Sequence, residues 1–365
     1  MSMWVCVRRV PKNATAVARV RDTVFGTLER DVPARVEPLT LELRQPFHIA
    51  HGTSDRRHNV LLQLHGGLGE AAAVTYLGET RAGIQAYFDS VDFDAFGDAR
   101  HVRDNVRRLP EGSPAARAAI DMALHDAWGK ALNQPLYRLF GLDPRRIPET
   151  SLTIALESPS VMAERARSAD TPLLKIKLGS GDEDEARLIA VRAATSKRLR
   201  VDANAGWSLE RALYLLPLLA DHGVELVEQP LPVGDLEGLR TLSALPRRPA
   251  LFVDESIRSS RDIAVHAGLV EGVVIKLAKS GGLLAARDQI AVAHALGLQV
   301  MLGCMIESTL AVTAAAHLAP LVEHIDLDGP LLIANDPFDG VRYLPGGKLA
   351  LPDRPGLGVV RRAPS

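Results

Sequence analysis

Residues 173–204, LLKIKLGSGDEDEARLIAVRAATSKRLRVDAN, contain the pattern of one repeating unit of the fold. It opens with a short apolar run, Leu173–Leu178, which contains two lysines. A helical stretch, Asp182–Ala194, follows, and a second apolar run, Leu199–Ala203, ends next to an asparagine. Continuous apolar runs are typical of parallel strands that are buried on both faces. This segment therefore predicts a strand, a helix and the next parallel strand.

The same alternation extends from Ser151 to residue 328. The apolar runs are Leu152–Leu156, Leu173–Leu178, Leu199–Ala203, Val224–Glu228, Ala250–Asp254, Gly272–Leu277, Gln299–Cys304 and His324–Asp328. Helical patterns lie between them. Eight parallel strands with intervening helices predict a (β/α)8-type barrel, here assigned to residues 150–328, and a doubly wound parallel sheet is the alternative.

The chain before the barrel has a different pattern. Three β-runs are expected at Arg35–Phe47, Val60–Leu64 and Glu70–Tyr76, and an Ala-rich helix at Ala115–Leu132. These elements predict an α+β domain over residues 35–141. Two outer segments complete the expected organisation: an N-terminal arm, 1–34, and a Gly- and Pro-rich C-terminal segment, 329–365, that folds back on the first domain.

Composition excludes several classes of function. The formal net charge is −1, which argues against a nucleic-acid binder or a polybasic membrane module. No apolar run reaches the roughly 18 residues of a membrane span. The two cysteines, Cys6 and Cys304, are far apart and fit a reducing compartment, so we expect a cytoplasmic protein.

Charged residues mark the ends of successive strands. Lys177, Asp202, Glu228, Asp254 and Lys276 follow one another at steps of 25, 26, 26 and 22 residues, about one βα unit each. A single strand-terminal aspartate is commonly a helix cap, but five charged residues in this register point to a site at the carboxyl rim of the barrel. The chain has 8 lysines against 35 arginines, so two lysines at this rim stand out.

This set of residues suggests metal-assisted proton transfer. Three carboxylates on neighbouring strand ends form an oxygen-rich site that suits Mg²⁺. The cation can stabilise the enediolate that forms when a carboxylate loses its α-proton, and lysines on either side can remove and return that proton. Lys175 is expected to make Lys177 a better base by like-charge repulsion.

Longer motifs resemble the enolase superfamily, in the subgroup of the muconate-lactonizing enzymes. The matching strings are Lys-Ile-Lys at 175–177, Asp-Ala-Asn-Ala-Gly-Trp at 202–207, Glu-Gln-Pro at 228–230, Asp-Glu-Ser at 254–256 and Ile-Lys-Leu-Ala-Lys-Ser-Gly-Gly at 275–282. The resemblance implies a modified TIM (β/α) barrel with an N-terminal α+β capping domain. It also implies Mg²⁺ on Asp202, Glu228 and Asp254, with acid/base roles for Lys177 and Lys276.

Within this subgroup, two segments resemble those of dipeptide epimerases. The first is Met305-Ile306-Glu307-Ser308, and the second is Asp326-Leu327-Asp328, similar to an Asp-x-Asp pair that holds the α-ammonium group of the substrate. The substrate-binding candidates are therefore Lys175, Cys304, Glu307, Asp326 and Asp328.

The expected capping loop departs from relatives that act on Ala-Glu. Their loop arginine could pair with the glutamate side chain, whereas alignment on Pro46-Phe47 places Gly52 at that position. Arg56 and Arg57 lie further along the chain and are left unassigned. Contacts from Phe47, Ile49 and Gly52 are expected, and the side-chain preference stays open.

The leading hypothesis is an isomerase: a Mg²⁺-dependent dipeptide epimerase that inverts the α-carbon of the C-terminal residue by two-base 1,1-proton transfer. Its partner would be a dipeptide, with no nucleic acid or membrane involved, and a homo-oligomer is kept open. One alternative is a lyase or cycloisomerase with the same site, of the o-succinylbenzoate synthase or muconate cycloisomerase type. Another is a catalytically silent barrel used for binding.

Overall fold

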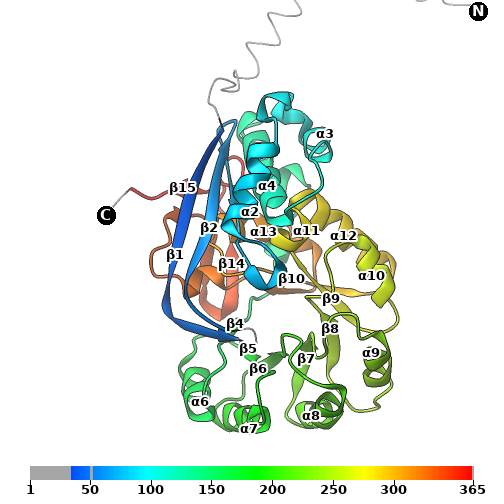
Figure 1. The fold of residues 1–365 in the computed structure, drawn as a ribbon. Coiled ribbons are helices and arrows are strands. Elements are labelled where there is room, and N and C mark those ends of the chain that lie inside the picture. The colour runs from blue at the N-terminus through cyan, green and yellow to red at the C-terminus, as the bar shows by residue number, and fades with distance from the viewer. Residues whose placement is uncertain (1–33, 50–51, 364–365) are drawn as a thin grey trace, which may run out of the picture.

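The computed structural model describes residues 34–49 and 52–363. Almost all of the expected N-terminal arm, 1–34, therefore lies outside the described residues, as does Cys6. The described chain forms a barrel and a strand-rich domain that lies against it (Figure 1).

Eight parallel strands form the barrel. They are β4 (Leu152–Ile154), β5 (Leu173–Lys177), β6 (Arg198–Asp202), β7 (Val224–Glu228), β8 (Ala250–Val253), β9 (Gly272–Lys276), β10 (Gln299–Gly303) and β11 (His324–Asp326). Neighbours in the chain are neighbours in the sheet, from β4 to β11. Thr150, just before β4, forms a parallel bridge with Ile325 of β11, which nearly closes the sheet. The predicted barrel is confirmed, and the doubly wound alternative is wrong.

Helices follow most of these strands and cover the barrel. They are α6 (Pro159–Ser168), α7 (Asp184–Ala194), α8 (Leu209–Asp221), α9 (Leu236–Ser243), α10 (Ser260–His266), α11 (Leu277–Ser280), α12 (Leu283–Ala295) and α13 (Thr309–Ala316). Their starts follow local capping chemistry. The side chain of Ser208, for example, accepts a hydrogen bond from Arg211 N and so begins α8.

The N-terminal domain combines an antiparallel sheet with helices. Its strands are β1 (Arg35–Ile49), β2 (Gly52–Leu64) and β3 (Gly67–Ala71), and its helices are α2 (Arg81–Ser90), α3 (Val102–Arg107) and α4 (Pro114–Ala131), with α5 (Leu136–Leu139) after it. Ser113 caps α4 and Pro114 takes its first position, as the sequence favours.

The third expected β-run was misplaced. Glu70–Tyr76 was expected, but β3 begins at Gly67 and ends at Ala71, and Thr75–Leu77 is a 3-10 turn. The chain reverses at residues 65–66, both of which have positive φ. Gly67 and Gly69 lie in the strand because α4 packs directly against it: a β-carbon on Gly69 would stand 1.9 Å from Ala119 O.

The far end of the β1–β2 hairpin reaches the barrel. In Figure 1 the two long strands run down one side of the molecule and end close to β4, β5 and β6. Leu156 N, just after β4, donates to His48 O at 3.0 Å. The first domain therefore reaches the carboxyl rim of the barrel.

The C-terminal segment contacts the first domain at several points. Its short strands are β12 (Phe338–Asp339), β13 (Arg342–Leu344), β14 (Lys348–Ala350) and β15 (Val360–Arg361). Ala334 N donates to Glu42 O of β1 at 2.8 Å, and Leu357 N donates to Asp126 Oδ1 of α4 at 2.8 Å. These contacts tie the end of the described chain to its beginning.

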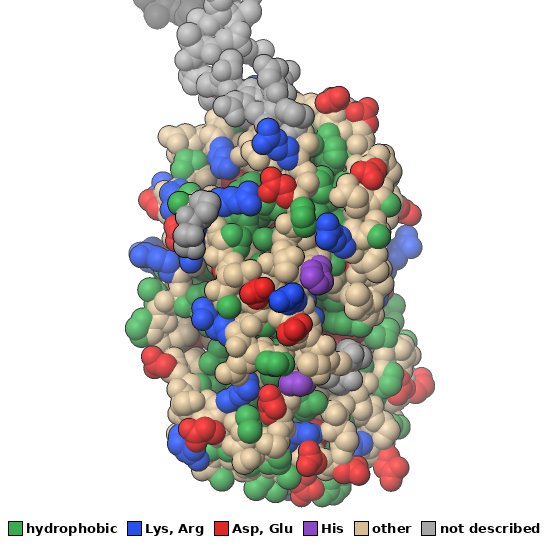
Figure 2. All heavy atoms as spheres, turned by 60° about the vertical axis from the view of Figure 1, so that its left-hand side comes forward, with side chains coloured by type: hydrophobic (Ala, Val, Ile, Leu, Met, Phe, Trp, Pro, Cys, Tyr) green, Lys and Arg blue, Asp and Glu red, His purple; other side chains and the backbone are tan. Residues whose placement is uncertain are grey.

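The outer surface carries both signs of charge. On the face drawn in Figure 2, basic and acidic side chains alternate, with hydrophobic side chains scattered between them. This mixture agrees with the near-zero net charge. Of the helices in the described part of the chain, none combines the length and apolar character that a membrane crossing requires.

Candidate active site

The charged strand-end residues come together at one rim of the barrel. Lys177, Asp202 and Glu228 are the last residues of β5, β6 and β7, and register pairs Lys177 with Asp202 and Asp202 with Glu228. Asp254 directly follows β8, and Lys276 ends β9. All five side chains are buried. Parallel strands in register bring these residues, about a βα unit apart in sequence, to one edge.

Lys175 is the centre of a buried ion-pair cluster. Its Nζ lies 3.1 Å from Asp202 Oδ2, 2.6 Å from Glu228 Oε2 and 2.7 Å from Asp326 Oδ2. Lys177 Nζ lies 2.6 Å from the same Asp202 oxygen. Burial alone would lower the pKa of Lys175, but the three carboxylates outweigh it and hold that pKa well above its usual range. Lys175 thus balances negative charge as well as standing next to Lys177.

Asp254 is held by two further lysines. Lys276 Nζ lies 2.8 Å from Asp254 Oδ2, and Lys279 donates to the other carboxylate oxygen and to the backbone carbonyl of Asp254. Burial would raise the pKa of Asp254, but these ammonium groups hold it below its usual range. Sequence reasoning gave Lys279 no role. Its position three residues after Lys276 in a Lys-poor chain was the only signal.

Backbone strain is concentrated beside these carboxylates. Asn204 and Gln229 have φ of 43° and 38°, in the left-handed region that non-glycine residues rarely adopt. Asn204 N donates to Asp202 Oδ1 at 2.9 Å. Gln229 Oε1 accepts from Asp254 N at 3.0 Å and from Ser256 N at 3.2 Å. The strained residues therefore help to orient two of the three candidate metal ligands.

The donor set fits a hard divalent cation. Both carboxylate oxygens of Glu228 are buried, and in residues 34–49 and 52–363 neither accepts a hydrogen bond, although Lys175 lies close to one of them. Burial and the neighbouring charge of Asp202 raise the pKa of Glu228 to about 8. Lys175 thus faces Oε2, whereas within the described residues no hydrogen bond satisfies the buried Oε1, and a cation can supply the partner that this oxygen lacks.

In the described part of the chain, no three acidic, histidine or cysteine side chains are gathered into a ready-made metal cluster. The reason lies in the contacts above: Asp202 and Asp254 are each turned towards lysine ammonium groups. Metal binding by Asp202, Glu228 and Asp254 therefore stays a prediction, supported by their chemistry and by the buried Oε1 of Glu228, which accepts no hydrogen bond in the described structure.

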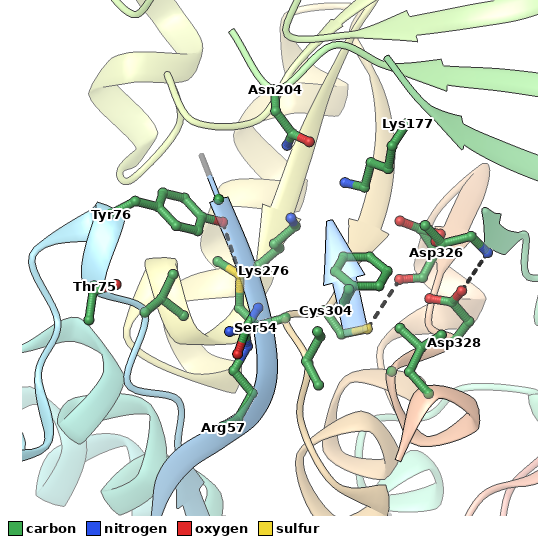
Figure 3. Close-up of a pocket in the computed structure, with 18 of the residues that line it drawn as sticks. Ser54, Arg57, Thr75, Tyr76, Lys177, Asn204, Lys276, Cys304, Asp326 and Asp328 are labelled. Carbon is green, nitrogen blue, oxygen red and sulfur yellow. Dashed lines mark hydrogen bonds between the residues drawn. The ribbon is translucent and has the colours of Figure 1, made fainter. Parts of the chain in front are cut away.

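A cavity of about 180 Å³ opens beside the rim. Both domains line it. The barrel contributes Thr153, Lys175, Lys177, Asn204, Lys276, Cys304, Met305, Ile306, Asp326 and Asp328, and the first domain contributes Phe47, Gly52, Thr53, Ser54, Arg57, Ala73, Val74, Thr75 and Tyr76. Figure 3 shows Lys177 and Lys276 pointing into this cavity from different strands.

Asp326 and Asp328 form an acidic pair at one end of the cavity (Figure 3). Asp326 accepts from Lys175 at 2.7 Å and from Ser151 at 2.6 Å, whereas Asp328 accepts from Thr153 N at 2.6 Å. Burial and the charge of Asp326 raise the pKa of Asp328 to about 6. This end of the cavity is suited to a cation.

Of the two other substrate-binding candidates, Cys304 lies at the cavity and Glu307 does not. Cys304 lines the cavity, and its thiol donates to Asp326 O at 3.5 Å; burial raises its pKa well above the usual value, so it is a poor nucleophile. Glu307 is not among the lining residues. Its carboxylate is buried and accepts from Met305 N, and burial together with Glu70 raises its pKa to about 7.

Glu307 therefore belongs to the junction of the two domains. The neighbouring Ser308 donates from its backbone and its hydroxyl to Glu70 of β3, which also accepts from Asn59 Nδ2 of β2 at 2.7 Å. Glu307 was expected among the substrate contacts because the segment Met305-Ile306-Glu307-Ser308 resembles that of dipeptide epimerases. Met305 and Ile306 still line the cavity, whereas Glu307 is buried and its carboxylate accepts from Met305 N.

The expected contacts from the capping loop are partly described. Phe47 and Gly52 line the cavity, while the side chain of Ile49 lies outside the described residues, as do residues 50–51. Sequence reasoning missed Arg57 and Tyr76, which also line the cavity. Tyr76 lies in the 3-10 turn after β3, whereas Arg57 lies in β2. The direction of Arg57 depends on strand register, which a period-2 pattern alone could not fix here because β1 and β2 shift register between Glu42 and Phe47.

Comparisons with known proteins agree with this architecture. A family model described as the mandelate racemase / muconate lactonizing enzyme N-terminal domain matches residues 33–141, and one described as enolase C-terminal domain-like matches residues 161–363. The chain is 36% identical to an L-Ala-D/L-Glu epimerase of Bacteroides thetaiotaomicron, a match that covers 89% of this chain and 86% of the relative.

One further relative and one solved structure are also similar to this chain. A hydrophobic dipeptide epimerase of Roseobacter litoralis is 40% identical, over 88% of this chain and 96% of the relative. A solved structure of a dipeptide epimerase from Cytophaga hutchinsonii, complexed with Mg and the dipeptide D-Ala-L-Val, superposes with a TM-score of 0.84 at 27% identity and covers 90% of this chain and 95% of its own.

Proposed function

The chain belongs to the enolase superfamily, and from this premise we propose that it is a Mg²⁺-dependent dipeptide epimerase. The proposed reaction inverts the α-carbon of the C-terminal residue by 1,1-proton transfer. One observation carries the proposal: Lys177 and Lys276 line the same cavity as the acidic pair Asp326 and Asp328. This combination provides two groups for proton transfer and a partner for a substrate ammonium group.

The two lysines stand on opposite sides of the barrel. Lys177 ends β5 and Lys276 ends β9, and four steps separate these strands in an order of eight. An α-carbon held between them presents one face to each ammonium group. One lysine, after losing its proton, removes the α-proton, and the other delivers a proton to the opposite face. The configuration of the carbon is then inverted.

Each lysine is held near a carboxylate until it acts. Lys177 Nζ lies 2.6 Å from Asp202 Oδ2, and Lys276 Nζ lies 2.8 Å from Asp254 Oδ2. These contacts limit the positions of the two amines. A preorganised amine spends less free energy on orientation when the substrate binds.

Asp202, Glu228 and Asp254 would hold the metal. Bound Mg²⁺ would supply electrostatic stabilisation of the negative charge that develops on the substrate carboxylate when the α-proton leaves. The buried Oε1 of Glu228, which accepts no hydrogen bond in the described structure, and the oxygen-only donor set support this assignment.

Asp326 and Asp328 would bind the N-terminal ammonium group of the dipeptide. Their carboxylates are buried at one end of the cavity, and the charge of Asp326 already makes ionisation of Asp328 costly. An ammonium group placed there offsets the repulsion between them. The relatives described above, an L-Ala-D/L-Glu epimerase and two dipeptide epimerases, support the same substrate class.

Exchange of the α-proton in D₂O tests the proposal. The protein is incubated with Mg²⁺ and a panel of L-Ala-L-X dipeptides, and deuterium at the α-carbon of the second residue is followed by NMR together with the appearance of the L-D epimer. We expect both signals with at least one dipeptide. If no dipeptide in the panel gains α-deuterium, the protein is not a dipeptide epimerase.

The same assay separates the lyase or cycloisomerase alternative. An Asp326→Ala variant is expected to lose exchange with dipeptides. Full activity of this variant on an amine-free acid would instead favour the alternative, since such a substrate has no ammonium group for Asp326 to bind. The cytoplasmic location and a homo-oligomeric state stay predictions from the sequence.

A further inference from the structure

The cavity has opposite charges at its two ends. Figure 3 shows Asp326 and Asp328 on one side and Arg57, Ser54, Thr75 and Tyr76 on the other, with Lys276 between them. A dipeptide has its ammonium group at one end. If that group lies at the acidic pair and the α-carbon lies between the lysines, the side chain of the second residue extends towards the end that holds Arg57.

Strand register fixes the direction of Arg57. It lies in β2, two residues before Asn59, so both side chains are on the same face of the strand. Asn59 anchors that face: its Nδ2 donates to Glu70 Oε1 at 2.7 Å and to Ile306 O of the barrel at 3.3 Å. Arg56 lies on the opposite face, where it is exposed and sits 3.6 Å from Glu42.

Arg57 is a cation without a counter-ion. Its side chain is half-buried in the cavity wall, and within the described part of the chain it forms no hydrogen bond or ion pair. Burial lowers its pKa, but a guanidinium group stays protonated in proteins. A partly desolvated charge without a partner is unfavourable, and an anionic group of a ligand would remove that cost.

The surroundings of Arg57 suit a carboxylate. Thr75 lines the same end of the cavity and offers a further hydroxyl donor, whereas the hydroxyl of Ser54 already donates to Arg56 O at 2.5 Å. Gly52 contributes no side chain there, and a β-carbon on it would have no neighbour within 4 Å, so the loop leaves space. A planar guanidinium group can bind both oxygens of a carboxylate at once.

We propose that Arg57 makes this enzyme selective for dipeptides whose C-terminal residue carries an acidic side chain, glutamate or aspartate. The inference rests on the proposed epimerase function and adds the substrate class to it. The names of the relatives leave this question open, because one refers to Glu and another to hydrophobic dipeptides. Arg57 is assigned to substrate recognition and has no role in proton transfer.

Two dipeptides of the same shape and different charge provide the test. The kcat/KM for α-proton exchange in D₂O is measured with L-Ala-L-Glu and its neutral isostere L-Ala-L-Gln. Charge-assisted hydrogen bonds are worth about 1.5–3 kcal/mol, so we expect the protein to prefer L-Ala-L-Glu by about 10- to 100-fold. In the Arg57→Met variant kcat/KM should fall much more for L-Ala-L-Glu than for L-Ala-L-Gln, so that the preference is lost, and Arg57→Lys should keep part of the preference.

Arg56→Met is the matched control, because it removes a neighbouring arginine from the opposite face of the same strand. It should keep the full preference for L-Ala-L-Glu. A protein that does not prefer L-Ala-L-Glu overturns the inference. So does an equal loss on both dipeptides in Arg57→Met and Arg57→Lys, because Arg57 would then contact a group that the two share or support the loop. Exchange with no dipeptide at all would overturn the proposed function as well.

Discussion

Gly303 and Lys276 are paired on the neighbouring strands β10 and β9, and a β-carbon on Gly303 would stand 3.0 Å from Lys276 Cε. The same β-carbon would lie 3.3 Å from Val274 Cγ1. Gly303 has no positive φ, so its backbone does not require glycine. The absence of a side chain is needed instead to leave room for the stem of Lys276.

Gly303→Ala is therefore expected to displace the Lys276 amine while leaving the barrel folded. A shift of a few tenths of an ångström at a group that transfers a proton should lower kcat by about tenfold or more, with a smaller change in KM. Steady-state epimerisation together with circular dichroism measures both effects. Gly97→Ala is the control, since the nearest atom to its β-carbon is a side-chain oxygen 3.7 Å away. An unchanged kcat in Gly303→Ala would mean that Lys276 tolerates the new methyl group.

The two lysines are expected to act on different stereoisomers. Lys177→Ala and Lys276→Ala should each abolish epimerisation, and each should retain deuterium exchange from only one of the two epimers, because the remaining lysine still reaches its own face. General acid–base groups contribute about 10²- to 10⁴-fold, so the lost exchange should fall by at least that range. Lys348→Ala, at an exposed position, serves as the control. Equal loss from both epimers in both variants would contradict the two-base assignment.

The rim of the barrel was predictable because its geometry is repetitive. Each buried strand appears in the sequence as an apolar run. In a parallel barrel, the residue at the carboxyl end of every strand lies at the same rim. Lys177, Asp202, Glu228 and Lys276 end their strands, at or one residue before the ends of the expected runs, and Asp254 follows its strand by one residue. Sequence spacing alone was enough to bring these five residues together.

The contribution of the first domain was harder to predict. Arg57 and Glu307 show why: one was left unassigned but lines the cavity, and the other was expected at the cavity but is buried behind it. The direction of Arg57 depends on the register of β1 and β2, which an irregularity shifts. The position of Glu307 depends on packing between domains. Neither the strand register nor the packing between domains produces a periodic pattern that a single sequence reveals.

Mg²⁺ binding can be tested without measuring activity. A ligand that binds only the folded protein raises its stability by about 2.7 kcal/mol when present at 100 times its Kd. We therefore expect Mg²⁺ to raise the Tm of the protein, measured by calorimetry. Glu228→Gln should lose most of this shift, because Glu228 has buried oxygens without hydrogen-bond donors in the described structure. Glu70→Gln, a buried glutamate at the domain junction, should retain it; equal shifts in both variants would place the metal elsewhere.

Binding of the substrate ammonium group should depend on pH through Asp328. Burial and the neighbouring Asp326 raise its pKa to about 6. Below this pH the carboxyl group becomes neutral and attracts an ammonium group less strongly, so kcat/KM for a dipeptide should fall about tenfold per pH unit as the pH decreases below 6. Asp328→Asn should lower kcat/KM at pH 8 by about 10- to 100-fold and remove this limb of the profile. If Asp328→Asn still showed the fall in kcat/KM below pH 6, that fall would come from the titration of another group.

Acid should destabilise the fold through His317, far from this chemistry. His317 is fully buried: Tyr137 N donates to its Nδ1 at 3.1 Å, and its Nε2–H donates to Leu357 O at 3.1 Å. Burial lowers its pKa from 6.5 to about 4. Between these values the unfolded chain binds a proton that the folded chain does not, so stability falls as the pH drops from 6.5 towards 4 and is unaffected above 6.5. The loss attributable to His317 is about 2 kcal/mol at pH 5.

Urea unfolding at pH 7 and pH 5 measures this loss. His317→Gln keeps an acceptor and a donor at the position and cannot take up the proton, so the difference in the free energy of unfolding between the two pH values should shrink by about 2 kcal/mol relative to the unmodified protein. His324 also has a pKa lowered to about 4, and its contribution remains in both proteins and cancels in this comparison. If His317→Gln shows the same difference as the unmodified protein, His317 accepts its proton without unfolding, and the hydrogen bonds that link Tyr137 and Leu357 through its ring must rearrange in the folded state.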